Sequence, residues 1–145
     1  MDAIAADFNI ANSEKEIINF LKKNNFQSPI VLGGGTNVLF KENIENSILK
    51  IGIKGIEVSN ETDKHIQISV GAGENWKNFV DWCVNRNYGG LENLSLIPGN
   101  VGSAPIQNIG AYGVELKETF ESCKAISIKN GSLRVFKNKE CNFTY

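Results

Sequence analysis

The sequence predicts an α+β fold built from two small lobes. Two amphipathic helical patterns, beginning near residues 14 and 76, alternate with short apolar segments that are typical of strands. Gly52 and Gly55 separate a first unit of helix, strand, glycine loop and strand from a second unit that is mainly strand. We therefore expect a first lobe over residues 1–54 and a strand-rich second lobe over residues 55–145.

The first unit opens with a helix that has clear end signals. Ser13 and Glu16 form a capping box before the apolar residues, and Lys22 and Lys23 complement the carbonyl end of the helix. The apolar run at residues 30–32 is too short for a helix and predicts a buried strand. Residues 48–51 predict another strand, and a glycine triplet lies between the two.

The second unit begins with a predicted β-meander, in which residues 56–58 and 66–70 flank a polar tip. The helix that follows has its apolar residues at helical spacing: Trp76, Phe79, Val80, Cys83 and Val84. After a long glycine-rich segment, Asn130-Gly131 predicts a hairpin with a two-residue turn.

Composition excludes several classes of protein. The 145 residues carry a net charge of −1 with no basic stripe, so we expect no nucleic-acid partner. No apolar run approaches the roughly 20 residues that span a bilayer, which predicts no membrane association and a cytoplasmic location. Cys83, Cys123 and Cys141 lie far apart with no metal-site spacing, so we expect reduced, mostly buried thiols and no metal.

The glycine triplet is the first candidate binding segment. Consecutive glycines after a buried strand let several N–H groups converge on an anion. The segment lacks the sixth-position glycine of the dinucleotide fingerprint and the Lys-Ser/Thr pair of the phosphate loop. Taken alone, it fits a plain tight turn as well as a phosphate cradle.

A second candidate is Gly71-Ala72-Gly73, which precedes the second helix and could offer its N-terminal amides to an anion. The sequence favours a packing turn here, because Glu74 would repel a phosphate at that place. His65 heads a strand without a base or metal partner, which predicts a surface histidine.

The third candidate, residues 91–113, combines glycines and two prolines with apolar residues and has Glu92 as its only ionised side chain. Loops of this length are uncommon in compact domains unless they are functional, so binding is favoured over a long structural loop. Its mixture of apolar and neutral hydrogen-bonding groups suits a flat cofactor with polar edges. Glu92 is either a general acid or a capping group.

Together these motifs resemble the UDP-N-acetylenolpyruvoylglucosamine reductase family. The matching segments are residues 33–39, 71–76, 90–94 and, most specifically, 97–113. The resemblance implies a truncated, two-lobed α+β FAD-binding domain of the vanillyl-alcohol-oxidase-like (PCMH-type) flavoprotein family, with its substrate domain absent. FAD is the implied cofactor, and NADPH is the implied reductant of the full-length enzyme.

The resemblance also implies which residues bind the cofactor. The pyrophosphate would lie on the backbone amides of the triplet loop, and the flavin and ribityl chain would lie along the longer segment. Near the pyrophosphate the implied residues are Gly33, Gly34, Gly35, Thr36, Asn37, Val38 and Leu39. Along the flavin they are Ile97, Pro98, Gly99, Val101, Gly102, Ser103, Ile106, Gln107, Gly110, Ala111, Tyr112 and Gly113. No retained catalytic residue is assigned, and Tyr145 is a candidate substrate contact.

The implied reaction uses NADPH to reduce UDP-N-acetylglucosamine enolpyruvate to UDP-N-acetylmuramate for peptidoglycan, which serves cell wall biogenesis, cell shape and cell division. Family members carry an arginine, a glutamate and a serine or cysteine beyond the position of Tyr145. We therefore expect a fragment that is inactive alone and that self-associates through exposed edges. The alternatives are the FAD-binding domain of another flavin oxidoreductase, or an FAD-free interaction module.

Overall fold

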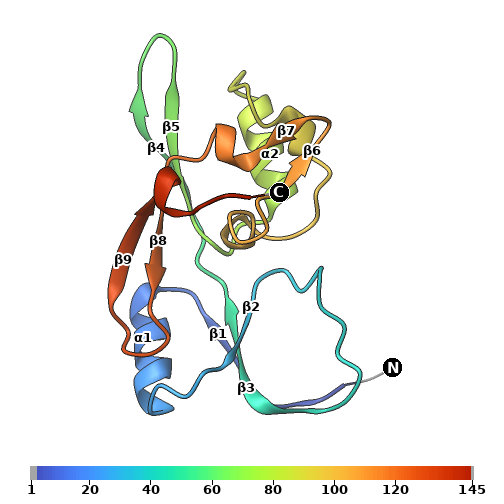
Figure 1. Cartoon of the computed structure of the whole chain (residues 1–145), viewed down its shortest axis with the longest axis vertical. Helices are drawn as coiled ribbons and strands as arrows, with labels where there is room; N and C mark the ends of the chain where they lie inside the picture. Colours follow the sequence, from blue (N-terminus) through green and yellow to red (C-terminus); the bar gives the residue numbers. More distant parts are fainter. Residues whose placement is uncertain (1–2, 145) are drawn as a thin grey trace.

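The computed structural model describes residues 3–144, which gather around two hydrophobic cores (Figure 1). One core lies between the first helix and a parallel sheet. The other, which we call the upper core from its place in Figure 1, surrounds the second helix and the glycine-rich segment, residues 91–113. Tyr145, the candidate substrate contact, lies outside the described residues.

The first core rests on a 3-stranded parallel sheet of order β1-β3-β2, with β1 at Ala5–Ala11, β2 at Ile30–Leu32 and β3 at Ile44–Ile51. The two predicted strands are confirmed as β2 and β3, and β1 is an addition. The prediction that β2 is buried was wrong, because it is an edge strand and Val31 is 49% exposed. The glycine triplet begins directly after β2.

Helix α1, Glu14–Lys23, covers one face of this sheet and buries Ile17, Phe20 and Leu21. The Ser13 side chain accepts a hydrogen bond from the Glu16 N–H at 3.2 Å, as the capping box predicts. The Glu16 carboxylate reaches one residue further back than expected and accepts from the Asn12 N–H at 2.8 Å.

The second core is built on α2, Trp76–Val84, which lies beside the antiparallel hairpin of β4, Ile56–Glu61, and β5, Ile66–Val70 (Figure 1). The helix buries its predicted apolar face except at Val84, in its last turn, which is exposed. The Trp76 indole N–H donates to the Leu94 carbonyl at 2.8 Å inside this core. The long loop is thereby fastened to the helix.

The glycine-rich segment folds into short pieces rather than one open loop. It contains 3-10 helices at Glu92–Leu94 and Val101–Ser103 and the strand β6, Gly110–Ala111, which pairs with β7, Val114–Glu115, just beyond the segment. A further 3-10 helix follows at Leu116–Glu118. Leu94, Ala104 and Ile109, together with Leu116 just beyond the segment, are buried and anchor it to the core around α2.

The chain ends in a hairpin of β8, Ser122–Ile126, and β9, Leu133–Lys137, followed by a 3-10 helix at Asn138–Glu140. The predicted two-residue turn was wrong. The Ser127 N–H donates to the Ser132 carbonyl at 2.8 Å and the Gly131 N–H donates to the Ser127 carbonyl at 2.7 Å, so the connection is longer. Gly131, with φ of 71°, closes this longer turn.

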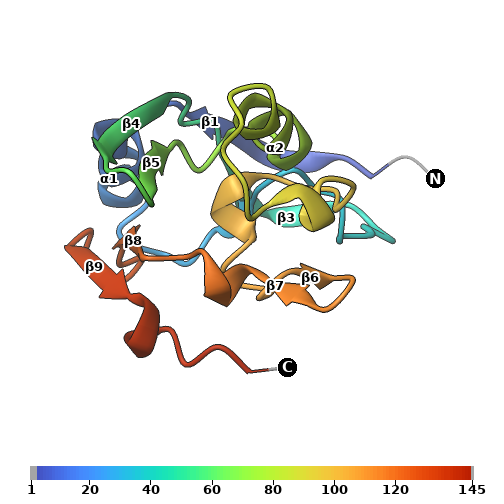
Figure 2. The ribbon, with the colours of Figure 1, turned by 90° about the horizontal axis from the view of Figure 1, so that it is seen from above.

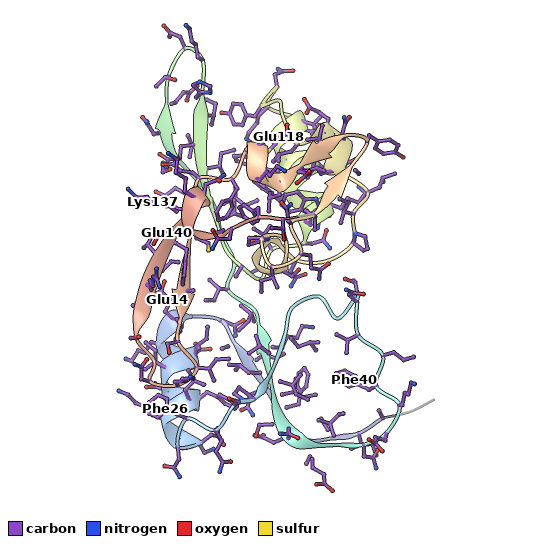
Figure 3. The ribbon with its side chains drawn as sticks, viewed as in Figure 1. Glu14, Phe26, Phe40, Glu118, Lys137 and Glu140 are labelled. Carbon is purple, nitrogen blue, oxygen red and sulfur yellow. The ribbon has the colours of Figure 1, made fainter. Side chains whose placement is uncertain are left out.

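This hairpin packs against α1, from the other end of the chain. Ile126 and Ile128 join the core beneath α1, and Lys124 forms an ion pair with Glu14. Figure 3 shows Glu14 and Phe26 at the two ends of α1, both beside the hairpin, and Figure 2 shows α1 and β9 on the same side of the molecule. The division at residues 54 and 55 remains a prediction, and the hairpin makes a contact across it.

Candidate functional site

The glycine triplet and the residues 99–103 lie against each other at the end of β2. A Cβ built on Gly34 would stand 3.0 Å from Asn100 Oδ1 and 3.2 Å from Gly99 Cα, and one built on Gly33 would stand 3.7 Å from Ser103 Cβ. We call residues 33–37 together with residues 99–103 the glycine juncture. In Figure 1 the loop after β2 lies directly beneath the glycine-rich segment.

The loop side of the juncture offers unused hydrogen-bond donors. Within residues 3–144, the N–H groups of Gly34, Gly35, Thr36 and Asn37 donate to no protein acceptor. These residues are exposed, and Gly35 has φ of 72°, a left-handed conformation that curves the loop. Successive free N–H groups on a curved loop form an anion-binding nest. The geometry therefore favours the phosphate cradle over the plain turn.

The opposite side of the juncture is fixed by the turn at residues 71–74. The Gly102 N–H donates to the Ala72 carbonyl and the Val101 N–H donates to the Glu74 carbonyl, each at 2.9 Å. On its other side this turn is bonded to residues 52–55, which connect the two cores. The Gly73 N–H donates to the Ile53 carbonyl at 2.8 Å. The turn is a packing element, as the sequence indicated.

The position of the Glu74 carboxylate corrects the prediction that this residue would repel a phosphate at the start of α2. Glu74 precedes α2 and turns its carboxylate away from the helix end, to the Gly55 N–H at 2.8 Å. Two of the N-terminal amides of α2 are occupied by acceptors of the protein itself. The Trp76 N–H donates to the Gly99 carbonyl at 3.0 Å, and the Asn78 N–H donates to Asn75 Oδ1 at 3.0 Å.

Three large apolar side chains in or next to the segments that carry the juncture are exposed. Leu39 is 77% exposed, and Ile106 and Tyr112 are each 85% exposed. Exposed apolar side chains of this size are typical of a ligand or partner site where they form one patch. Of the other residues implied along the flavin, Pro98, Gln107, Gly110 and Gly113 are exposed, whereas Ile97, Val101 and Ala111 pack against the upper core.

The two halves of the glycine-rich segment occupy different places. Residues 99–103 meet the triplet, whereas residues 110–113 form the β6–β7 hairpin, higher in the upper body (Figure 1). Among the described residues, no hydrogen bond joins that hairpin to the triplet loop. A ligand that touches both must extend across the face of the upper core.

Asn108 is a polar residue of this segment that the sequence did not single out as cofactor-binding. Asn108 donates through Nδ2 to Glu115 Oε2 at 2.7 Å, and its Oδ1 is buried with no partner in the described part of the chain. The ion pair with Lys117, followed by this bond from Asn108, lowers the pKa of the Glu115 carboxyl. Amide side chains inside a glycine-rich loop were the available signal.

The structure favours capping as the role of Glu92. Its carboxylate accepts from the Gly90 N–H at 2.7 Å, and backbone N–H groups, its own first and then that of Gly90, lower the pKa of this carboxyl. A carboxyl that acts as a general acid near neutral pH needs a raised pKa, which is the opposite shift. His65 is exposed, as predicted, and donates its backbone N–H to the Thr62 hydroxyl.

The cysteines are free thiols. Cys83 is buried, and burial raises its pKa to about 11, so it is unreactive. Cys123 and Cys141 are only half-buried, which corrects the expectation for them. No group of three or more metal-binding side chains forms within residues 3–144. Over the same residues, no helix is long and apolar enough to cross a membrane.

Two partly open hollows in the described part of the chain lie away from the juncture. One of about 310 Å³ is lined by the end of α1 and the start of β3, and one of about 260 Å³ lies between α1 and β1. Neither includes a residue of the juncture. The juncture is therefore recognised as a candidate binding site by its free N–H groups and not by a hollow.

Comparison with known proteins agrees with this geometry. A family model described as an FAD binding domain matches residues 8–137. The chain belongs to this FAD-binding domain family. The cofactor of the domain is FAD, and the predicted α+β FAD-binding fold is confirmed.

Individual relatives make the match more specific. The UDP-N-acetylenolpyruvoylglucosamine reductase of Flavobacterium johnsoniae is 46% identical over 145 residues, which are 100% of this chain and 43% of the relative. The reductase of that name from Bdellovibrio bacteriovorus is 49% identical over 79% of this chain and 34% of its own length. The predicted resemblance is confirmed, and the FAD-binding domain spans less than half the length of these relatives.

A solved structure supports the fold. The crystal structure of UDP-N-acetylenolpyruvylglucosamine reductase from Thermus caldophilus superposes with a TM-score of 0.73 at 22% identity. The superposition covers 95% of this chain and 48% of that one. At this identity the match concerns the fold of the FAD-binding domain.

Proposed function

We propose that this chain is the FAD-binding part of a UDP-N-acetylmuramate dehydrogenase. The observation that carries the proposal is the set of free N–H groups at Gly34, Gly35, Thr36 and Asn37, which face solvent at the glycine juncture. Such donors suit the pyrophosphate of FAD. The relatives named above supply the reaction type, because they bear the name of this reductase.

The residues of the juncture fit the cofactor in polarity and in space. The N–H groups of the loop would bind the pyrophosphate, with Gly33 leaving the approach open and Val38 and Leu39 beside it. A Cβ on Gly34 would already crowd Asn100, so an unsubstituted backbone is needed where the loop meets residues 99–103. The flavin and ribityl chain would lie along the surface from Pro98 to Gly113.

Bound FAD would supply hydride transfer from NADPH to the enolpyruvyl double bond of UDP-N-acetylglucosamine enolpyruvate. The chain's own part in this is to bind and orient the cofactor and to exclude water from one of its faces through Ile106 and Tyr112. The product, UDP-N-acetylmuramate, serves peptidoglycan synthesis, and thereby cell wall biogenesis, cell shape and cell division. Both reactants are soluble nucleotides, so we assign the reaction to the cytoplasm.

A chimera tests this proposal directly. Residues 1–145 would replace the matching part of the Flavobacterium johnsoniae relative, and NADPH oxidation would be followed with and without the enolpyruvyl substrate. We expect oxidation that depends on the substrate in the chimera, and no steady turnover from the FAD-loaded 145-residue chain alone. A chimera that binds FAD but ignores the enolpyruvyl substrate would refute the reductase assignment, and steady turnover by the chain alone would refute its dependence on the rest of the relative.

A further inference from the structure

Glu74 occupies the crossing of the segments that form the juncture. Its main-chain carbonyl accepts from the Val101 N–H at 2.9 Å, and its own N–H donates to the Gly71 carbonyl at 3.0 Å. The next residue, Asn75, forms a β-bridge with Asn100. Through its backbone, Glu74 therefore fixes the turn that carries one wall of the juncture.

The side chain of Glu74 reaches in the opposite direction, to the connection between the two cores. Its Oε1 accepts from the Gly55 N–H at 2.8 Å, and its Oε2 lies 3.5 Å from Lys54 Nζ. Lys54 Nζ also donates to the Gly73 carbonyl at 2.5 Å. The Glu74 side chain is 21% exposed, so solvent competes only partly for these bonds.

The connection at residues 52–55 leads to the other wall. It follows β3 directly, and β3 pairs with β2 through Ile48, Leu49 and Lys50. The triplet loop then leaves the end of β2. The triplet loop is thus held through β2, β3 and the connection at residues 52–55. Residues 99–103 are held through the turn at residues 71–74. Glu74 is hydrogen-bonded to Gly55 in the connection and to Val101.

We propose that the Glu74 carboxylate is a positioning residue that sets the spacing of the two walls and thereby the affinity for FAD. This inference rests on the proposed cofactor site. Without the carboxylate, Gly55 loses its acceptor. The connection is then held to the turn only by the bonds from the Gly73 N–H to the Ile53 carbonyl, from the Gly71 N–H to the Gly55 carbonyl and from Lys54 to the Gly73 carbonyl, which leaves it freer to move relative to residues 99–103. The loop donors and residues 99–103 then no longer meet FAD in one fixed arrangement, which weakens preorganised binding.

The test compares variants of the 145-residue chain. Glu74→Ala removes the acceptor, Glu74→Gln keeps an amide oxygen for the Gly55 N–H, and Glu74→Asp keeps the charge but shortens its reach. Asp81→Asn is the control, because it alters an exposed ion pair with Lys77 on the solvent side of α2. FAD affinity is measured by flavin fluorescence, and hydrogen exchange of the Gly55 and Val101 amides is measured without FAD.

We expect Glu74→Ala and Glu74→Asp to weaken FAD binding about tenfold, the effect of losing one charge-assisted hydrogen bond. Exchange should rise at Val101 as well as at Gly55, whereas Glu74→Gln should retain most of both properties and Asp81→Asn should change neither. Faster exchange at Gly55 alone, with FAD affinity unchanged, would overturn the proposal. So would equal losses in Glu74→Ala and Glu74→Gln.

The exchange measurement keeps this test separate from the proposed function. If the folded wild-type chain binds no FAD, the cofactor site fails, and the coupling is judged by the Val101 amide alone. Faster exchange there in Glu74→Ala but not in Glu74→Gln would support the coupling, and unchanged exchange would overturn it. Should Glu74→Ala fail to fold, Glu74→Asp is the comparison with Glu74→Gln.

Discussion

Gly102 packs directly against Ala72. A Cβ built on Gly102 would stand 2.6 Å from the Ala72 Cβ, and the Gly102 N–H donates to the Ala72 carbonyl at 2.9 Å. Real Cβ atoms do not approach so closely, so the size of these two residues fixes how near the glycine-rich segment comes to the turn at residues 71–74. The juncture depends on this contact because Gly99 and Asn100 lie in the same turn of chain.

Enlarging Gly102 should therefore destabilise the fold. We expect Gly102→Ala to lower the free energy of unfolding by about 1–3 kcal/mol, as overpacking does in other cores. Adding Ala72→Gly in the same chain should restore much of the loss, because it removes the opposing methyl group. Urea unfolding of the single and double variants measures the coupling. Strictly additive effects would contradict the contact.

The buried hydrogen bond between Trp76 and Leu94 should stabilise the upper core. Trp76→Phe keeps an aromatic ring but leaves the Leu94 carbonyl without its donor, at a site where both residues are buried. A buried acceptor left unpaired costs about 1–3 kcal/mol. Trp82→Phe, at a half-buried position of the same helix, is the control in urea unfolding. Equal effects of the two changes would contradict the role given to the bond.

Glu92 should make the fold sensitive to acid. Its pKa is lowered in the folded chain by backbone N–H groups, so its contribution to stability is present above the ordinary value of 4.5. That contribution is lost as the pH falls through the lower folded value. The melting temperature should therefore fall less steeply below about pH 4.5 in Glu92→Gln than in the wild type. An NMR titration midpoint of Glu92 above 4.5 would refute this explanation.

We also expect the isolated chain to self-associate. Among the described strands β9 pairs only with β8, and Leu133 and Val135 on it are 49% and 54% exposed. An unpaired edge with apolar side chains favours pairing between copies. Light scattering should show mass rising with concentration, and Val135→Lys should reduce the rise more than Val84→Lys on α2. A clean monomer over a wide concentration range would contradict the expectation.

The helices could be predicted from the sequence because their determinants are local. Ser13 and Glu16 mark the start of α1, and the spacing of Trp76, Phe79 and Val80 defines the buried face of α2. The failures concern distant contacts. The β1 strand forms by pairing with β3, far along the chain, and the exposure of Val31 depends on which strand lies at the sheet edge.

The candidate site, like the fold, could be predicted from the sequence only in its local features. The triplet and the 97–113 motif were recognisable as segments, and the family resemblance implied that they share a cofactor. That Gly34 meets Asn100, and that Glu74 faces Gly55 rather than the helix end, depends on packing between segments far apart in sequence. No local pattern encodes those contacts.

Equilibrium titration of the folded 145-residue chain with FAD tests the central claim most directly. Flavin fluorescence would be followed in the wild type, in Gly34→Asp, and in Asn130→Asp, which adds the same charge at the distant β8–β9 turn. We predict saturable binding by the wild type and by Asn130→Asp, and loss of binding in Gly34→Asp, since a carboxylate in the nest repels the pyrophosphate. No binding by folded wild type, or equal binding by Gly34→Asp, would contradict the assignment of the glycine juncture as the FAD site.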